Sequence, residues 1–177
     1  MDGPLGLVAG RFMAKGNAAA ELEALDELAP APGDSVLVIG FGPGVGIEAL
    51  LPRLPSGRIG GADPSWAMHR LARRRTRDPR VRLERTTAAS LPWPDDCFDG
   101  ATAVNSIMFW KPLAASAAEV ARVLRPGARL VTVTHNWALR EPDEIVRALT
   151  SNGFAEVSRR PATAEEGRAT MLVATAS

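Results

Sequence analysis

Four glycines at every second position end the segment VLVIGFGPGVG, residues 36–46. Glycine inside a helix or strand costs roughly 0.5–1 kcal/mol relative to alanine, so this density indicates a sharp turn or a close approach to the backbone. Asp63 ends the next apolar segment, RIGGAD. Backbone N–H groups at a glycine loop before a helix suit an anion, and a carboxylate can accept two ribose hydroxyls. The pair predicts an adenosine-like cofactor with an anionic group, and tight helix–strand packing alone is the alternative.

Few titratable side chains could remove a proton from a substrate. His135 follows the β-branched segment ARLVTVT, residues 128–134. The ordinary pKa of histidine, about 6.5, suits proton removal near neutral pH. We therefore predict His135 as a general base, with a surface or capping histidine as the alternative. His69 lies in an arginine-rich segment and is interpreted as a surface residue, and the sequence contains no tyrosine.

The elements that must position these residues alternate along the chain. Helices are predicted over residues 18–28, 45–53, 64–77, 113–124 and 141–151. Strands are predicted over residues 36–39, 58–63, 80–85, 100–104, 128–134, 154–159 and 170–175. This alternation predicts an α/β fold with a parallel sheet covered on both faces. Ligands of such sheets bind beyond the carboxyl ends of the strands, where the glycine loop, Asp63 and His135 would fall.

Composition bounds the class of protein. The 177 residues, with 46% hydrophobic and 23% charged residues, are typical of one globular domain. The net charge of +1 gives no general attraction to nucleic acid or a membrane. The single Cys97 excludes an internal disulfide and a site of several cysteines, so we predict no metal and a cytoplasmic location. No apolar run reaches the roughly 18 residues of a membrane span.

Arginines are concentrated between residues 70 and 85, which raises an RNA-binding hypothesis. Asp78 and Glu84 dilute this charge, so a solvated basic face is the favoured interpretation. A phosphate-bearing acceptor stays open. The arginines are Arg70, Arg73, Arg74, Arg75, Arg77, Arg80, Arg82 and Arg85.

The spacing of the glycines distinguishes between cofactors. A dinucleotide fingerprint needs G-x-G-x-x-G or A. If the fingerprint begins at Gly40, its sixth position is Val45, which is a mismatch. If the fingerprint begins at Gly44, the residues match through Ala49, but the turn then lies four residues past the end of the strand. A G-x-G-x-G loop fits residues 40–44 directly after the strand.

That loop resembles the first motif of class I S-adenosylmethionine-dependent methyltransferases. The segment GGADPSWAM resembles their ribose-acid segment, and TTAASLPWPDDCFDGATAVNS resembles the motifs at the ends of the third and fourth strands. The segment EVARVLRPGARLVTV resembles the family's signature before the fifth strand. The resemblance runs from about residue 30 to 177 and extends to a bacterial subgroup of small-molecule type. It implies a three-layer sandwich with a seven-stranded, mostly parallel sheet whose last strand is antiparallel. We expect a single domain, with residues 1–30 as a helical lid and 31–177 as the cofactor-binding core.

The resemblance implies S-adenosylmethionine as the cofactor and S-adenosylhomocysteine as the product. The glycine loop would line the methionyl part, Asp63 the ribose, and the segments after the second and third strands the adenine. Asn105 and Ser106 would face the sulfonium and methyl, which makes Asn105 a second catalytic candidate beside His135. The implied cofactor-binding residues are Gly40, Phe41, Gly42, Gly44, Asp63, Pro64, Thr87, Ala88, Asn105 and Ser106.

Aromatic side chains could wall an acceptor pocket, because their faces suit planar or cationic groups. Phe109, Trp110 and Trp137 are the candidates, with ordinary core packing as the alternative for Phe109. Met13 and Asn17 could close over the cofactor from the lid, which could instead be a helix merely packed on the sheet.

Two departures from the family pattern keep a second function open. Val38 stands where the first motif usually carries an acid, and Thr87 replaces a usual aspartate. The first hypothesis is methyl transfer to an oxygen or nitrogen of a small molecule, in secondary metabolism, and a homodimer could complete the acceptor pocket. The second is a catalytically inactive cofactor-binding or scaffold protein, and a nicotinamide dehydrogenase is third. Asn105 heads NSIMFW and not Asn-Pro-Pro-aromatic, which argues against nucleic-acid methylation.

Overall fold

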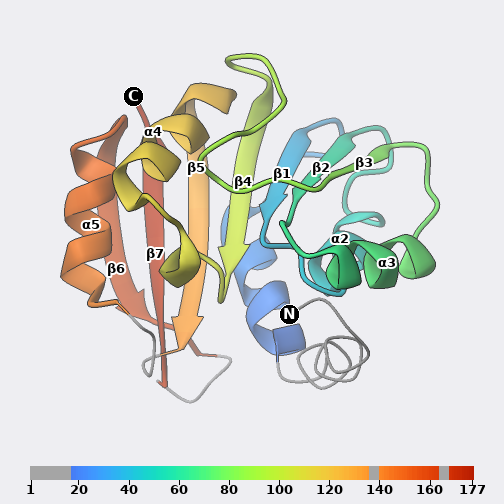
Figure 1. The fold of residues 1–177 in the computed structure, drawn as a ribbon, viewed down its shortest axis with the longest axis horizontal. Helices are drawn as coiled ribbons and strands as arrows, with labels where there is room; N and C mark the ends of the chain where they lie inside the picture. Colours follow the sequence, from blue (N-terminus) through green and yellow to red (C-terminus); the bar gives the residue numbers. More distant parts are fainter. Residues whose placement is uncertain (1–16, 136–139, 164–167) are drawn as a thin grey trace.

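The computed structural model describes residues 17–135, 140–163 and 168–177. Seven strands form one sheet in the order β3-β2-β1-β4-β5-β7-β6 (Figure 1). β7 runs antiparallel to β5 and β6, and the other neighbours are parallel. The predicted seven-stranded sheet with an antiparallel last strand is therefore confirmed. The strands are β1 (Ser35–Ile39), β2 (Arg58–Ala62), β3 (Val81–Glu84), β4 (Phe98–Val104), β5 (Leu124–His135), β6 (Phe154–Pro161) and β7 (Ala169–Ala176).

Helices cover both faces of the sheet. One apolar cluster joins residues of helix 17–28, α2 and α3 to one side of the strands, and a second joins η1, α4 and α5 to the other side. In Figure 1, α4 and α5 lie over the β4–β7 half, and α2 and α3 lie near β1–β3. The helices are 17–28, α2 (Val45–Leu50), α3 (Trp66–Arg75), α4 (Leu113–Val123) and α5 (Pro142–Thr150), with the 3-10 turn η1 (Ile107–Phe109).

The alternation of side chains along β1 explains why that strand is buried on both faces. Leu37 and Ile39 belong to the cluster of α4 and α5, whereas Val36 and Val38 belong to the cluster of helix 17–28. Successive side chains of a strand point to opposite faces, so a continuous apolar run is what a central parallel strand requires.

The strand order creates a crevice between β1 and β4. From β1 the chain crosses through α2 to β2 on one side, and from β4 it crosses through α4 to β5 on the other. The helices that leave these two strands cover opposite faces, since Ile47 of α2 and Leu113 of α4 lie in different clusters. Such a switch point leaves room at the carboxyl ends of the strands, which is where ligands bind in open α/β sheets.

Several predicted boundaries differ from the structure, among them the following three. α2 ends at Leu50, three residues before the predicted end. Pro64 lies before α3, because the side chain of Ser65 caps that helix by accepting from the N–H of Met68 at 3.4 Å. β5 begins at Leu124 and not at residue 128: Phe98 pairs with Leu124 and Gly100 with Arg129, and the residues between form an irregularity of the strand.

Candidate functional site

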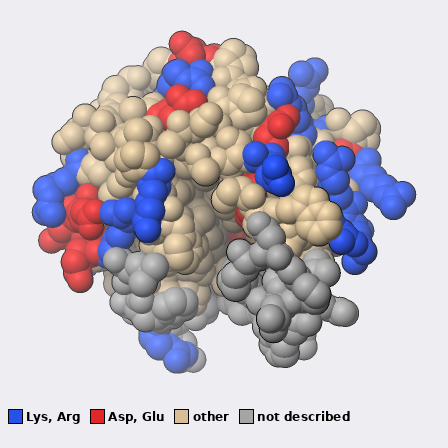
Figure 2. Space-filling view, viewed as in Figure 1, with Lys and Arg blue, Asp and Glu red and all other residues tan. Residues whose placement is uncertain are grey.

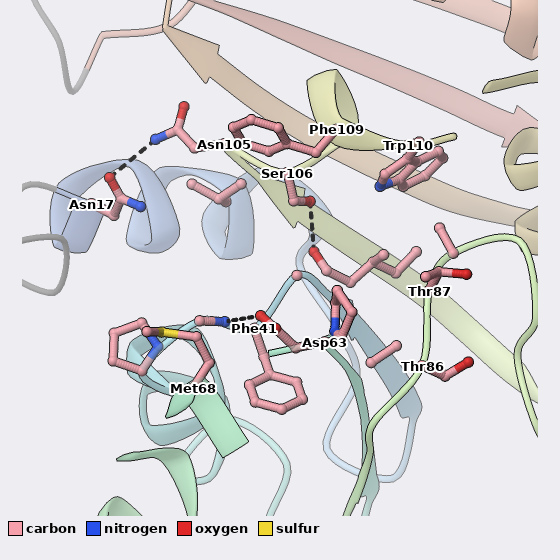
Figure 3. Close-up of a pocket in the computed structure, with 18 of the residues that line it drawn as sticks. Asn17, Phe41, Asp63, Met68, Thr86, Thr87, Asn105, Ser106, Phe109 and Trp110 are labelled. Carbon is pink, nitrogen blue, oxygen red and sulfur yellow. Dashed lines mark hydrogen bonds between the residues drawn. The ribbon is translucent and has the colours of Figure 1, made fainter. Parts of the chain in front are cut away.

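A cavity of about 330 Å³ opens at the carboxyl ends of β1, β2 and β4 (Figure 3). Helix 17–28 and the loops after β1, β2, β3 and β4 contribute its lining. The structure therefore brings together most of the residues that the sequence singled out. Those that line the cavity are Asn17, Gly40, Phe41, Gly42, Asp63, Pro64, Thr87, Ala88, Asn105, Ser106, Phe109 and Trp110.

Each glycine of the loop has its own reason to lack a side chain. A Cβ on Gly40 would lie 2.3 Å from the Cβ of Ser106, so β1 and β4 meet there without space. Gly42 has φ +52, and a Cβ on it would find only a backbone oxygen at 3.9 Å, so its free side faces open space. Gly44 has φ +89 and a Cβ on it would press on Ala72 at 3.0 Å. Gly44 thus lies outside the cavity that we expected it to line, because it packs the start of α2 against α3.

The carboxylate of Asp63 ties two sides of the cavity together. Its Oδ2 accepts from the N–H of Gly42 at 2.9 Å (Figure 3). Its Oδ1 accepts from the N–H of Ser65 at 2.8 Å. Asp63 is only 7% exposed. Burial raises its pKa, and the two backbone hydrogen bonds and the nearby His69 oppose that rise. A carboxylate has about four acceptor positions, so two remain for a ligand.

Asn105 connects three elements at the floor of the cavity. It has φ +49, and its Nδ2 donates to Oδ1 of Asn17 on helix 17–28 at 3.1 Å (Figure 3). Its Oδ1 accepts from the backbone N–H of His135 at 3.1 Å and lies 2.7 Å from Nδ1 of His135. Next to it, the hydroxyl of Ser106 donates to the carbonyl of Ile39 at 2.7 Å. These bonds join helix 17–28 and the ends of β1, β4 and β5.

The structure places His135 behind Asn105 and not in the wall of this cavity. His135 lines a second cavity, of about 250 Å³, together with Arg140 and Arg159. Because an amide oxygen can only accept, the contact with Asn105 places a proton on Nδ1 and makes Nε2 the basic nitrogen. His135 could therefore act as a base on an acceptor that reaches this second cavity, and its catalytic role stays a prediction.

The aromatic residues differ in exposure. Phe109 is 61% exposed, whereas Trp110 is 5% exposed and its indole Nε1 has no hydrogen-bond partner among the described residues. A buried donor without a partner costs free energy, so Trp110 offers a polar contact to whatever fills the cavity. Met13 and Trp137 lie outside the described residues.

Sequence reasoning missed Glu21, which lies in the lining on helix 17–28. Glu21 is 5% exposed, and its Oε2 has no hydrogen-bond partner in the part of the chain that the structure describes. Burial raises its pKa from 4.5 to about 8. The sequence did contain a signal for a buried acid, because the spacing of Glu21 from Ala24, Leu25 and Leu28 places all four residues on one face of a helix.

The basic face lies away from this cavity. Figure 2 shows lysine and arginine side chains gathered at the edge of the molecule where α3 and β3 lie. Acids accompany several of these arginines: Arg75 pairs with Glu48 and Arg80 with Asp78. This mixture of charges favours the solvated-face interpretation. Among the residues that the structure describes, no group of three acidic, histidine or cysteine side chains could hold a metal, and no helix is long and apolar enough to cross a membrane.

Comparison with known proteins identifies the family. Residues 36–127 match the family described as "Methyltransferase domain". The chain is 32% identical to the uncharacterized methyltransferase YdaC of Bacillus subtilis, over 70% of this chain and 68% of that protein. It is 39% identical to an uncharacterized 37.1 kDa protein in transposon TN4556 of Streptomyces fradiae, of which it covers 41%, and 33% identical to an O-methyltransferase of Pyrenophora dematioidea, of which it covers 58%. The chain belongs to the methyltransferase family, as predicted.

Solved structures share the fold. A chain in the complex of the Haloferax volcanii Trm112 methyltransferase activator with its methyltransferase superposes with a TM-score of 0.82 at 20% identity, covering 96% of this chain and 93% of that one. The geranyl diphosphate C-methyltransferase of Streptomyces coelicolor, solved with S-adenosylhomocysteine, gives 0.77 at 18% identity, covering 90% and 76%. These similarities confirm the predicted fold.

Gly42 faces open space and Gly44 faces Ala72, so the same substitution should have different effects at the two positions. A valine in the left-handed region costs about 1–2 kcal/mol at either position. We expect Gly42→Val to abolish binding of S-adenosylhomocysteine, because its side chain would enter the cavity, and to leave the domain folded. Gly44→Val, pressed against Ala72, should lower stability further and leave the affinity of the folded protein near that of the wild type. Calorimetric titration and urea unfolding measure both effects, and wild-type affinity in Gly42→Val would contradict this assignment.

The buried carboxyl of Glu21 predicts a pH dependence of stability. Its pKa is about 8 in the folded protein and near 4.5 when unfolded. Between these values the unfolded chain has lost a proton that the folded chain keeps, so rising pH stabilises the unfolded state. Glu21→Gln removes this term. We expect the stability of the variant relative to the wild type to rise between pH 4.5 and 8, by up to about 5 kcal/mol.

Urea denaturation at a series of pH values measures that difference. Glu48→Gln, at an exposed acid of α2, is the control and should show no such trend. A difference between Glu21→Gln and wild type that does not vary with pH would contradict the burial of an unpaired carboxyl.

Proposed function

We propose that this chain transfers a methyl group from S-adenosylmethionine to an oxygen or nitrogen of a small-molecule acceptor. The observation that carries the proposal is the cavity at the switch point, where the open side of Gly42 and the carboxylate of Asp63 lie together. The volume of about 330 Å³ falls in the range of small-ligand sites, which suits a cofactor of this kind.

The lining fits the chemistry of this cofactor. The remaining acceptor positions of Asp63 suit the two ribose hydroxyls. Ala62, Met68 and Ala88 give an apolar wall for the adenine, and Pro64 and Thr87 lie in the same lining. Gly42 leaves its side of the loop open for the methionyl part. Phe41 and Ser106 complete the lining that we assign to the cofactor.

Methyl transfer asks the protein for alignment, exclusion of water and removal of a proton. When bound, the cofactor supplies an already electrophilic methyl group. Phe109 and Trp110 would shield the reacting atoms from water and hold the acceptor. Asn105 would fix the ring of His135 through Nδ1, and Nε2 would take the proton of a hydroxyl or ammonium acceptor.

The kind of acceptor is supported by the relatives. One of them is named an O-methyltransferase, and the geranyl diphosphate enzyme binds a small molecule. Relatives from Bacillus and Streptomyces support a bacterial protein, and we propose a role in secondary metabolism. A second copy of the chain could complete the acceptor side of the cavity.

The ribose assignment predicts the effect of Asp63→Ala. Charge-assisted hydrogen bonds contribute roughly 1.5–3 kcal/mol each, so the affinity for S-adenosylhomocysteine should fall well over tenfold. Stability should fall as well, because the N–H groups of Gly42 and Ser65 lose their acceptor. Calorimetry compares this variant with Asp78→Ala, a control at an acid that pairs with Arg80 and does not line the cavity. Retained affinity in Asp63→Ala, or binding of NAD by the wild type in its place, would contradict the proposal.

The base assignment predicts the effect of His135→Ala on turnover. A screen of small hydroxyl and amine compounds for radiolabelled methyl transfer would first provide an acceptor. With it, His135→Ala should lower turnover by about 10²–10⁴-fold and leave the affinity for S-adenosylhomocysteine unchanged. Turnover within about threefold of wild type would show that the acceptor arrives deprotonated or reacts through carbon.

A further inference from the structure

The cavity holds one acid that the fold does not use. Among its described lining residues the carboxyl groups are those of Glu21 and Asp63, and Lys111 is the cation. Asp63 already accepts two backbone N–H groups. Oε2 of Glu21 is buried and accepts none from the described residues. Burying a carboxyl without a partner is unfavourable, so this carboxyl is available to a positively charged group of a ligand that fills the cavity.

The position of Glu21 indicates which end of a ligand it would meet. A Cβ on Gly46 would lie 2.4 Å from Oε2 of Glu21, so the carboxyl rests against the backbone just after the glycine loop. Gly42, whose open side faces the cavity, lies in that same loop. Asp63, assigned to the ribose, is joined to Gly42 by a hydrogen bond. Glu21 is thus next to the loop that we assign to the methionyl part.

Strand β1 contributes no acid to this part of the cavity. The β1 side chains that face helix 17–28 are Val36 and Val38, both fully enclosed in its apolar cluster. The methionyl part of the cofactor carries an α-ammonium group, and a cation entering an apolar, water-poor cavity needs a counter-ion.

We propose that Glu21 is the counter-ion of the α-ammonium group of the bound cofactor, and the residue by which this chain recognises its amino-acid end. The inference rests on the proposed function, since it takes S-adenosylmethionine as the ligand. It explains why a glutamate occupies a core position of helix 17–28: its Oε2, which has no partner among the described residues, would meet the positive charge that the ligand brings. The raised pKa agrees with this geometry.

The test compares two ligands that differ in the group concerned. S-Adenosylhomocysteine carries the amino-acid end, and 5′-methylthioadenosine keeps the adenosine and sulfur without it. Glu21→Gln keeps the size of the side chain and removes its charge. Calorimetry should show a loss of affinity for S-adenosylhomocysteine of at least tenfold in this variant and no change for 5′-methylthioadenosine. The control Glu48→Gln removes an exposed acid of the neighbouring helix and should bind both ligands as the wild type does.

Proton release gives a second readout that a merely structural role would not produce. The other titratable groups around Glu21 are Glu23, Asp26 and Glu27 on its own helix, Glu48 on α2, His69 and four arginines on α3, and Asp63 and Lys111 in the cavity lining. At pH 7 a carboxyl with a pKa of about 8 is mostly protonated, and pairing with an ammonium makes it ionise. Titration in buffers of different ionisation enthalpy should detect release of about one proton per S-adenosylhomocysteine bound, and none in Glu21→Gln.

The outcomes separate this inference from the function on which it rests. Equal affinity of wild type and Glu21→Gln for S-adenosylhomocysteine would overturn the counter-ion, as would an equal loss for both ligands, which would mark Glu21 as structural. Normal binding with lost turnover would equally overturn it. Failure of the wild type to bind either ligand would overturn the proposed function itself.

Discussion

One buried carboxylate holds together the two chain segments between which the cavity forms. Asp63 follows β2, and it accepts from Gly42 in the loop after β1 and from Ser65 at the start of α3. Removing a carboxylate from water is unfavourable unless hydrogen bonds replace the lost hydration, and here two backbone N–H groups do so. The glycine loop keeps its left-handed turn beside this anchor. The wall of the cavity is thereby fixed before any ligand arrives, which lowers the entropy cost of binding.

The strand order supplies the space, and a few polar contacts close it. The helices that follow β1 and β4 leave to opposite faces of the sheet at the switch point. The absent side chain of Gly40 lets Ser106 reach the carbonyl of Ile39. Asn105 then links β4 to His135 on one side and to Asn17 on the other. The site is therefore built from strand ends and one helix that precedes the sheet. His135, at the end of this network, lines the second cavity.

Local pattern predicted the elements and the glycine loop well, because strand, turn and helix each leave a periodic signature. It predicted Asp63 because one acid ends one apolar strand. It could not assign Gly44, since only the packing of α2 on α3 shows that this glycine faces Ala72. Nor could it single out Glu21 among the acids of helix 17–28, because helical phase shows a buried position but not what lies opposite. The placement of His135 behind Asn105 depends on the register of β4 against β5, which no local pattern contains.

The central claim is that this cavity binds S-adenosylmethionine through Asp63 and Glu21. A crystal structure of the protein grown with S-adenosylhomocysteine tests it most directly. The account predicts the ligand in this cavity, its ribose hydroxyls on the Asp63 carboxylate and its ammonium on that of Glu21, with Gly42 against the methionyl part. A ligand bound elsewhere, or one whose ammonium meets another acceptor while Glu21 stays unpaired, would contradict it.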